Sequence, residues 1–161
     1  MLIVIDDVLD EERRSAVASY FSQSQEARSM KWEPGGVEEL EVNQSPMAIL
    51  LKKAAKFFDL SGMVGSEYWA HYGTRPGWHV DRDEDLALSS GNIKHPICSI
   101  VYYAQIENLV GGKFMTKDEV ITPKTNRMII FSSGIEHSVE YYIGTRLSVA
   151  VNPWQTKPIG Y

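Results

Sequence analysis

The chain has 161 residues, of which 43% are hydrophobic and 23% are charged, and its formal net charge is −5. A chain of this length is expected to form one domain with its own core. The composition excludes collagen-like, coiled-coil and intrinsically disordered proteins. The acidic balance argues against a protein that binds nucleic acid through general attraction to phosphate groups.

The cysteine content and the first residues bear on where the protein acts. The single cysteine, Cys98, excludes an internal disulfide and a cysteine-rich zinc module, which fits a reducing compartment. The opening MLIVIDDVLDEERR has a short apolar run with acidic residues behind it, unlike a signal peptide. No uncharged apolar run is long enough to span a bilayer. We therefore expect a cytoplasmic protein that does not associate with membranes.

The first 65 residues predict a helical flank that begins with a strand. Residues 2–5 (LIVI) are typical of a short buried strand. Either Asp6 or Asp7 is expected to cap the helix that follows, because a carboxylate accepts hydrogen bonds from the free amides at a helix start. Apolar residues at helical spacing predict that helix over residues 9–23.

The next segment, residues 24–44, is polar and contains two consecutive glycines after a proline, which indicates a loop or a loose hairpin. Ser45 followed by Pro46 is a typical helix start, since the hydroxyl can cap and proline suits the first helical position. This second helix is expected to end near residues 60–62.

After residue 65, short runs rich in Val, Ile, Tyr and Thr alternate with Gly, Pro and Asn. This pattern predicts a β core over residues 66–154, within a single domain that spans residues 1–161. Strands are expected near residues 66–72, 77–81, 97–106, 112–116, 118–122, 127–131, 136–142 and 146–152. Eight short strands without intervening helices indicate a mainly β sandwich, jelly roll or barrel, with the N-terminal helices covering one sheet. The acidic insert at residues 83–95 is expected to be a long, flexible loop.

The sequence contains one candidate metal site. His79 and Asp81 are two positions apart on a predicted strand, so their side chains point to the same face and can reach one metal ion. His137, on a later strand, is a candidate third ligand. The alternatives are a solvated strand end for the first pair and a packing role for His137. Two histidines and one carboxylate form the facial triad of non-haem Fe(II) oxygenases, which leaves three metal positions open.

Arg146 and Ser148 follow His137 on the next predicted strand. A hairpin with a four-residue loop at 142–145 would place His137 opposite Ala150 and all these side chains on one face. His137 and Arg146 would then be separated by a distance that a metal, a five-carbon diacid and a guanidinium could span. Arginine suits a carboxylate because its planar group donates two parallel hydrogen bonds. The alternative is an arginine that caps a sheet edge.

The chain resembles the Fe(II)- and 2-oxoglutarate-dependent dioxygenases, in particular their prolyl 4-hydroxylase-like branch. The resemblance runs from about Tyr68 to Trp154. It rests on HVD at 79–81, VYYAQ at 101–105, GGKF at 111–114, PKTNRMIIF at 123–131, His137, and TRLS at 145–148. It implies a double-stranded β-helix, or jelly roll, with helices packed on its outside.

The resemblance also implies a site and a reaction. His79, Asp81 and His137 would bind Fe(II), while Arg146 and Tyr103 would bind the distal carboxylate of 2-oxoglutarate. Further cosubstrate contacts are expected from two more side chains, Tyr72 and Ser148. The enzyme would hydroxylate an unactivated C–H bond while 2-oxoglutarate and O2 become succinate and CO2. Ascorbate is a further candidate cofactor.

The substrate is less sharply indicated than the cofactors. The resemblance favours a prolyl residue of a peptide, or an amino-acid-like small molecule, and the side chains expected to touch it are Trp78, Arg75 and Arg82. The branch that repairs alkylated bases usually has a second arginine six positions after the first, where this chain has Asn152. Nucleic acid is therefore an improbable partner. The alternative function is a cupin-like metal- or sugar-binding jelly roll without oxygenase activity, and the sequence indicates no oligomeric state.

Overall fold

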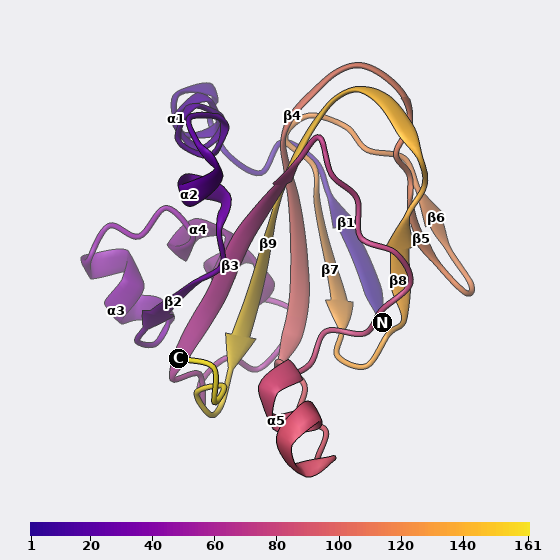
Figure 1. Ribbon diagram of the computed structural model, residues 1–161. Coiled ribbons are helices and arrows are strands. Elements are labelled where there is room, and N and C mark those ends of the chain that lie inside the picture. The colour runs from indigo at the N-terminus through magenta and orange to yellow at the C-terminus, as the bar shows by residue number, and fades with distance from the viewer.

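Two antiparallel sheets form the framework of the computed structural model, which describes residues 1–161 (Figure 1). The large sheet has six strands, in the spatial order β1 (Leu2–Ile5), β7 (Met128–Ser132), β4 (Cys98–Gly111), β9 (Tyr142–Trp154), β3 (Gly65–Tyr72) and β2 (Lys31–Pro34). The small sheet has three strands, in the order β6 (Val120–Ile121), β5 (Phe114–Thr116) and β8 (His137–Val139). This confirms the predicted mainly β jelly roll.

Four helices cover the outer face of the large sheet, on the side away from the small sheet (Figure 1). They are α1 (Glu11–Ser22), α2 (Gln25–Arg28), α3 (Val37–Val42) and α4 (Ala48–Ala54). Phe21 of α1 and Leu50 of α4 share one apolar core with Leu147 and Val149 of β9, and all four are fully buried. The predicted packing of N-terminal helices on one sheet is thus confirmed. No helix is long and apolar enough to cross a membrane.

Strand β9 separates the apolar core from the space between the two sheets. Its residues 147, 149 and 151 join the core beneath the helices, whereas residues 146, 148 and 150 line a pocket on the other face. This alternation follows from the two-residue period of a strand. The predicted common face for Arg146, Ser148 and Ala150 is therefore confirmed.

The hairpin predicted between residues 136–142 and 146–152 does not form. β8 pairs with β5 in the small sheet, where His137 lies opposite Thr116. β9 instead pairs with β3 and β4 in the large sheet. The chain crosses between sheets at this point, as jelly rolls do, and local alternation of polar and apolar residues does not encode such a crossing.

The first helix starts differently from the prediction. Asp10, and neither of the two earlier aspartates, caps α1, and its carboxylate accepts from the amide of Arg13 at 2.8 Å. Asp6 instead forms ion pairs with Arg127 at 2.7 Å and Lys124 at 3.0 Å. These pairs tie the end of β1 to the turn before β7.

The polar segment predicted as a loop contains α2, β2 and α3. β2 is ordered by pairing with β3 at the edge of the large sheet, a long-range contact that the sequence does not show. Helix α4 ends at Ala54, short of the predicted end at residues 60–62. The amides of Phe57 and Phe58 both donate to the carbonyl of Ala54 and close the helix with a turn.

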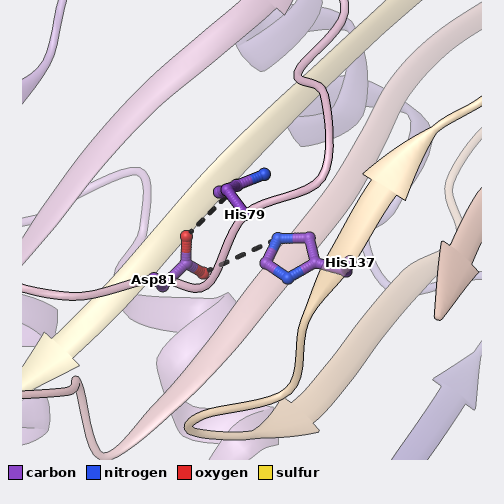
Figure 2. Close-up of side chains that lie close together, drawn as sticks. All are labelled: His79, Asp81 and His137. Carbon is purple, nitrogen blue, oxygen red and sulfur yellow. Dashed lines mark ion pairs between the residues drawn. The ribbon is translucent and has the colours of Figure 1, made fainter. Parts of the chain in front are cut away.

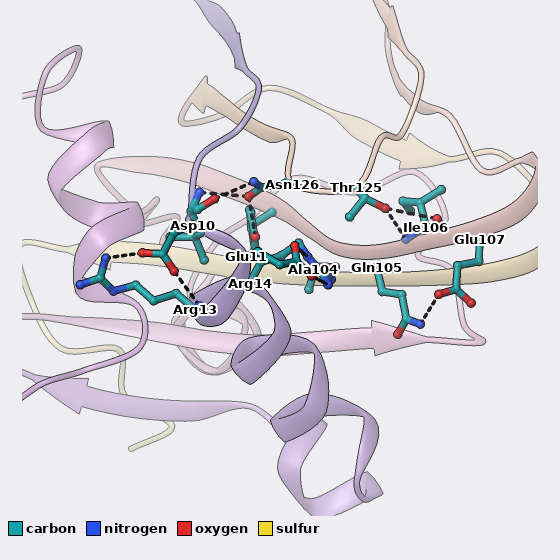
Figure 3. A network of polar contacts seen from close by, with 12 residues as sticks. Asp10, Glu11, Arg13, Arg14, Ala104, Gln105, Ile106, Glu107, Thr125 and Asn126 are labelled. Carbon is teal, nitrogen blue, oxygen red and sulfur yellow. Dashed lines mark hydrogen bonds and ion pairs between the residues drawn. The ribbon is translucent and has the colours of Figure 1, made fainter.

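A polar network joins the start of α1 to β4 and to the turn before β7 (Figure 3). Asn126 adopts the left-handed conformation, with φ of 66°, and its side-chain oxygen accepts from the amide of Leu9 and the hydroxyl of Tyr102. Arg14 donates to the carbonyl of Ala104 at 2.7 Å, where β4 bulges relative to β9. These contacts fix the part of β4 that reaches the candidate site.

The acidic insert at 83–95 holds a helix, α5 (Glu84–Ser90), and is not the predicted flexible loop. Asp83 caps it by accepting from the amide of Leu86 at 3.0 Å, and Gly91 ends it in the left-handed conformation. The second carboxylate oxygen of Asp83 accepts from the amide of Ile159 at 3.0 Å. The insert is therefore fastened to the C-terminal segment.

Candidate metal and cosubstrate site

His79, Asp81 and His137 meet between the two sheets (Figure 2). Their candidate ligand atoms all lie within 4.8 Å of one another. The carboxylate of Asp81 lies between the imidazoles, 3.6 Å from Nε2 of His79 and 4.0 Å from Nε2 of His137. The structure thus brings together the three residues that the sequence singled out, from two separate parts of the chain.

Backbone pairing brings the two histidines together. The predicted strand at 77–81 is reduced to a single antiparallel bridge, in which His79 and His137 exchange amide hydrogen bonds of 3.0 and 2.9 Å. In each ring, Nδ1 donates to a backbone carbonyl, that of Gly77 at 2.7 Å and that of Ile135 at 2.9 Å. Both Nε2 atoms are therefore left with a free lone pair, and this orientation suits metal ligation.

The electrostatics of the cluster favour the metal-binding forms of Asp81 and His137, and the opposite form of His79. Burial tends to raise the pKa of Asp81, but the adjacent imidazoles of His79 and His137 and the hydrogen bond from Ser99 hold the pKa below its ordinary value. Burial lowers the pKa of His137. The neighbouring carboxylate of Asp81 raises the pKa of His79, so this ring holds a proton more readily and a bound metal ion would take the place of that proton. An ionised carboxylate and a neutral imidazole are the ligand forms that a divalent cation requires.

Packing and a neighbouring hydroxyl hold the ligands in position. His137 stacks on Phe114, with ring centroids 5.3 Å apart, and meets the edge of Phe131 at 4.8 Å. The hydroxyl of Ser99 donates to Asp81 at 2.6 Å. The insert adds one more contact, from Nδ1 of His95 to the carbonyl of Asp81 at 2.7 Å. Neither Ser99 nor His95 was predicted to contact the cluster, because both contacts depend on the tertiary fold.

Arg146 is a buried cation without a carboxylate partner. Its side chain is 1% exposed, and it donates from Nε to the carbonyl of Gly112 at 3.1 Å and from Nη1 to Ser148 at 2.8 Å. Its guanidinium carbon lies 5.1 Å from the ring centroid of Tyr103. The hydroxyl of Tyr103 is buried and has no hydrogen-bond partner. Burying a charge and a hydroxyl in this way is costly unless a ligand satisfies both.

Gly112 makes room for this arginine. It adopts the left-handed conformation, with φ of 74°, and a Cβ at this position would lie 3.2 Å from Cδ of Arg146. Gly111 also has a positive φ, of 80°. The two glycines form a tight turn between β4 and β5.

Two connected pockets surround the cluster. The inner pocket is lined by the three candidate ligands together with Arg146 and Ser148, and its volume is about 30 Å³. This is room for about two water molecules, so a five-carbon diacid requires the surrounding side chains to move. The outer pocket has a volume of about 400 Å³ and opens towards α5 and the C-terminal segment. Five residues line both pockets, namely Trp69, His71, Pro76, His79 and Asp81.

The prediction that Tyr72 lines the cosubstrate pocket is wrong. Residues 67, 69 and 71 of β3 face the pockets, so Tyr72 faces the other side of the sheet. There the guanidinium of Arg28 lies 5.4 Å from its ring centroid. His71 lines the pockets instead and accepts from Nε1 of Trp69 at 3.1 Å. Burial lowers the pKa of His71 to about 4, which keeps the ring neutral.

The three side chains expected to touch substrate have different positions. Arg82 lines the outer pocket, where it pairs with Glu84 at 3.0 Å. Trp78 is 55% exposed and Arg75 donates to the carbonyl of Val139, and neither lines the two pockets. Contacts from these two residues remain predictions for a substrate that extends beyond the outer pocket.

Two buried polar residues of the outer pocket were not predicted as site residues. Glu67 and Asn152 lie directly opposite each other on β3 and β9. The parity of β9 was a usable signal for Asn152, because it is an even number of residues from Arg146 and so shares its face. No such signal identified Glu67, whose pairing partner depends on the sheet order.

Comparison with known proteins gives one sequence match and several similar folds. Residues 65–154 match the model of the 2OG-Fe(II) oxygenase superfamily, and no curated protein sequence matches the chain. A prolyl-4-hydroxylase from Pseudomonas putida has a TM-score of 0.65 at 18% identity, covering 97% of this chain and 88% of that one. IDO from Bacillus thuringiensis has a TM-score of 0.63 at 12% identity, covering 97% and 93%.

A third similar structure contains a bound peptide. It is a prolyl hydroxylase from Trichoplax adhaerens in complex with a peptide fragment of the hypoxia inducible factor oxygen degradation domain. Its TM-score is 0.59 at 12% identity, and the superposition covers 96% of this chain and 83% of that one. At these identities the solved structures establish a shared fold, while the sequence match spans more than half of the chain.

Proposed function

The chain belongs to the 2OG-Fe(II) oxygenase superfamily, and from that membership we propose that it hydroxylates an unactivated C–H bond of an amino-acid-like substrate. It is a dioxygenase whose cofactors are Fe(II) and 2-oxoglutarate. The observation that carries the proposal is that a His-Asp-His cluster and a buried, unpaired arginine line the same pocket.

The donor set of the cluster fits Fe(II). Two imidazole nitrogens and one carboxylate oxygen, from His79, Asp81 and His137, are the ligands of non-haem Fe(II) oxygenases, and three protein ligands leave positions for other groups. Both Nε2 atoms carry free lone pairs because each Nδ1 donates to a backbone carbonyl. These three residues would hold the metal.

The hydrogen-bond donors at the inner pocket suit the distal carboxylate of 2-oxoglutarate, which would enter after the surrounding side chains move. Arg146 has no acid within ion-pair distance, and the buried hydroxyl of Tyr103 lacks a partner. A carboxylate beside them would accept from both, while Ser148 remains available as a further donor. The planar guanidinium group of an arginine can donate two parallel hydrogen bonds to a carboxylate, and the ammonium group of a lysine cannot.

When bound, Fe(II) and 2-oxoglutarate would supply, together with O2, the oxidising chemistry that converts the C–H bond into an alcohol, with succinate and CO2 as co-products. The protein's own residues position the reactants. Arg146 and Tyr103 orient the cosubstrate, the bridge between His79 and His137 fixes the metal ligands, and Phe114 and Phe131 exclude water behind His137.

The outer pocket supports a substrate group of the size of one amino-acid residue, since its volume is about 400 Å³ and it adjoins the cluster. We propose a peptide residue, with proline as one candidate, or a free amino-acid-like molecule. The fold that this chain shares with two prolyl hydroxylases supports a peptide substrate. The sequence match argues against the alternative of a cupin-like binding protein without oxygenase activity.

A cytoplasmic location is also part of the proposal. It is supported by the buried free thiol of Cys98, whose pKa burial raises to about 12, because an unreactive lone cysteine suits a reducing compartment.

Succinate release tests the proposed function. Purified protein with Fe(II), 2-oxoglutarate and O2 is expected to release succinate, slowly alone and faster with a substrate drawn from amino acids and proline-containing peptides. His137→Ala and Arg146→Ala are expected to abolish this release. Equal succinate release by the parent and these variants would contradict the assignment.

A further inference from the structure

The outer pocket is acidic, in contrast to the inner pocket with its buried arginine. Its lining includes five carboxylates, those of Glu67, Asp81, Asp83, Glu84 and Asp85. Its single arginine or lysine is Arg82, which is already paired with Glu84 through hydrogen bonds of 3.0 and 3.1 Å. Some of these acids have structural roles, so the charge of the pocket alone does not define a ligand.

Glu67 is a buried acid of this pocket that has no cationic partner. It is 8% exposed, and its carboxylate accepts from Nε1 of Trp154 at 2.7 Å, with no lysine or arginine within ion-pair distance. Burial raises the pKa of Glu67, contacts with Trp154 and Tyr161 partly oppose this shift, and the negative charges of Asp81 and Asp83 add to it. A buried carboxylate without a cation is unfavourable, and a positively charged ligand would relieve this cost.

Asn152 provides an independent indication of a ligand. It is 3% exposed and lies opposite Glu67 in the register of β3 and β9, on the face that lines the outer pocket. Its side-chain oxygen is buried and has no hydrogen-bond partner. Most buried polar atoms in proteins have a hydrogen-bond partner. We therefore expect a ligand to supply the donor that this oxygen lacks.

The two ends of one strand therefore present opposite chemistry. Arg146 and Asn152 share a face of β9, separated by six residues, or about 20 Å at roughly 3.3 Å per residue. The arginine end offers donors to an anion, and the Asn152 end, with Glu67, offers acceptors to a cation. The His-Asp-His cluster borders both pockets.

We propose that the outer pocket binds a substrate through a positively charged nitrogen, an ammonium or a guanidinium group, held by Glu67 and Asn152. The proposal rests on the proposed function, since it names the class of substrate that the oxygenase hydroxylates. The cation stays chemically unchanged: the substrate C–H, O2 and 2-oxoglutarate become C–OH, succinate and CO2. The group can belong to a free basic amino acid or to a basic residue of a peptide.

Matched pairs of substrates that differ in charge test this proposal. N-acetyl-lysine amide is compared with N-acetyl-norleucine amide, and N-acetyl-arginine amide with N-acetyl-citrulline amide, by substrate-stimulated succinate release and by calorimetric binding with Mn(II) and 2-oxoglutarate. We expect at least one cationic member to bind and to stimulate release tenfold or more over its neutral partner. Free lysine and arginine, and a short peptide containing either residue, distinguish the two sources.

Variants of the pocket complete the experiment. Glu67→Gln keeps the size of the side chain and an acceptor for Trp154, and it should raise the KM for the cationic substrate at least tenfold without changing the KM for 2-oxoglutarate. Glu12→Gln, the same change on an exposed position of α1, is the matched control and should change neither value. If Glu67→Gln proves unstable, Asn152→Leu serves the same purpose.

The outcomes separate this proposal from the function on which it rests. Equal binding of neutral and cationic members, binding of neither, or an unchanged KM in Glu67→Gln overturns the cation proposal, while 2-oxoglutarate binding and unstimulated succinate release keep the oxygenase assignment. Loss of both 2-oxoglutarate binding and succinate release in the parent protein overturns the proposed function, and the cation proposal with it.

Discussion

The two faces of β9 are both buried, yet they are built from opposite chemistry. Towards the helices the strand presents Leu147, Val149 and Val151, all fully buried in the main apolar core. Towards the small sheet it presents Arg146 and Asn152, which are 1% and 3% exposed. Burial on the helical face stabilises the fold, whereas burial on the pocket face leaves polar groups short of partners.

Burial of side chains on the two faces has opposite effects on the free energy of folding. A fully buried aliphatic side chain contributes about 1.5–3 kcal/mol through removal of apolar surface from water. A buried polar group without a partner costs about 1–3 kcal/mol. Substitutions on the helical face should therefore reduce stability, and substitutions on the pocket face should reduce ligand binding with little loss of stability.

The largest effect is expected at the pocket face, from Arg146→Ala. Removing one partner of a buried charge pair costs on the order of 2–5 kcal/mol, or roughly 30- to 5,000-fold in 2-oxoglutarate affinity. Arg146→Lys should recover part of this loss, because lysine lacks the planar fork. Anaerobic calorimetry with Mn(II) measures the affinity, and parent-like binding by Arg146→Ala would end the assignment of this residue.

The matching change on the helical face is Leu147→Ala. We expect it to lower the free energy of unfolding by about 2–5 kcal/mol, because a fully buried leucine is replaced by a cavity. Urea unfolding measures this loss. The protein that remains folded should bind 2-oxoglutarate as the parent does. A loss of 2-oxoglutarate binding without a loss of stability would contradict the division of roles between the two faces.

Asn152→Leu tests whether the pocket face carries an unsatisfied polar group. Leucine has the same number of side-chain heavy atoms and the same branching as asparagine, and it removes a buried acceptor without a partner, so the free energy of unfolding should rise by about 1 kcal/mol. Affinity for a cationic substrate should fall in the same variant. Thermal unfolding and substrate binding are measured together, and a destabilised protein would mean that Asn152 has a structural role.

The smallest effect concerns Asp6, which lies outside both faces. Its ion pairs with Arg127 and Lys124 hold its pKa well below the ordinary value. The lowered pKa gives a stabilising contribution that is complete above the unfolded-state value near about 4 and is lost progressively as the pH falls from there through the lower pKa of the folded protein. Because Asp6 is partly exposed, Asp6→Asn should cost only about 1 kcal/mol at pH 7.

This cost should shrink as the pH falls below about 4, because protonation of Asp6 in the unfolded chain progressively removes the advantage that the ion pairs give to the folded parent protein. Urea unfolding of parent and variant at pH 7 and pH 3 measures the difference. A gap that is constant across this range would show that the ion pairs contribute nothing to stability.

The sequence predicted the chemistry of the site better than the path of the chain. Spacing and strand parity identified His79, Asp81 and Arg146 because these features are local. The crossing between sheets, which brings His137 from the small sheet, depends on long-range pairing and was predicted as a hairpin. Tyr72 was misplaced because a strand pattern gives the alternation of faces but not which face meets the pocket.

The direct test of the central claim is the stoichiometry of Fe(II) binding, measured by anaerobic equilibrium dialysis. The account predicts one Fe(II) per chain in the parent protein and in the folded fraction of Leu147→Ala, and strongly reduced occupancy in His79→Ala, Asp81→Ala and His137→Ala. Full Fe(II) occupancy in His137→Ala would contradict it, because the cluster between the two sheets would then not be the metal site.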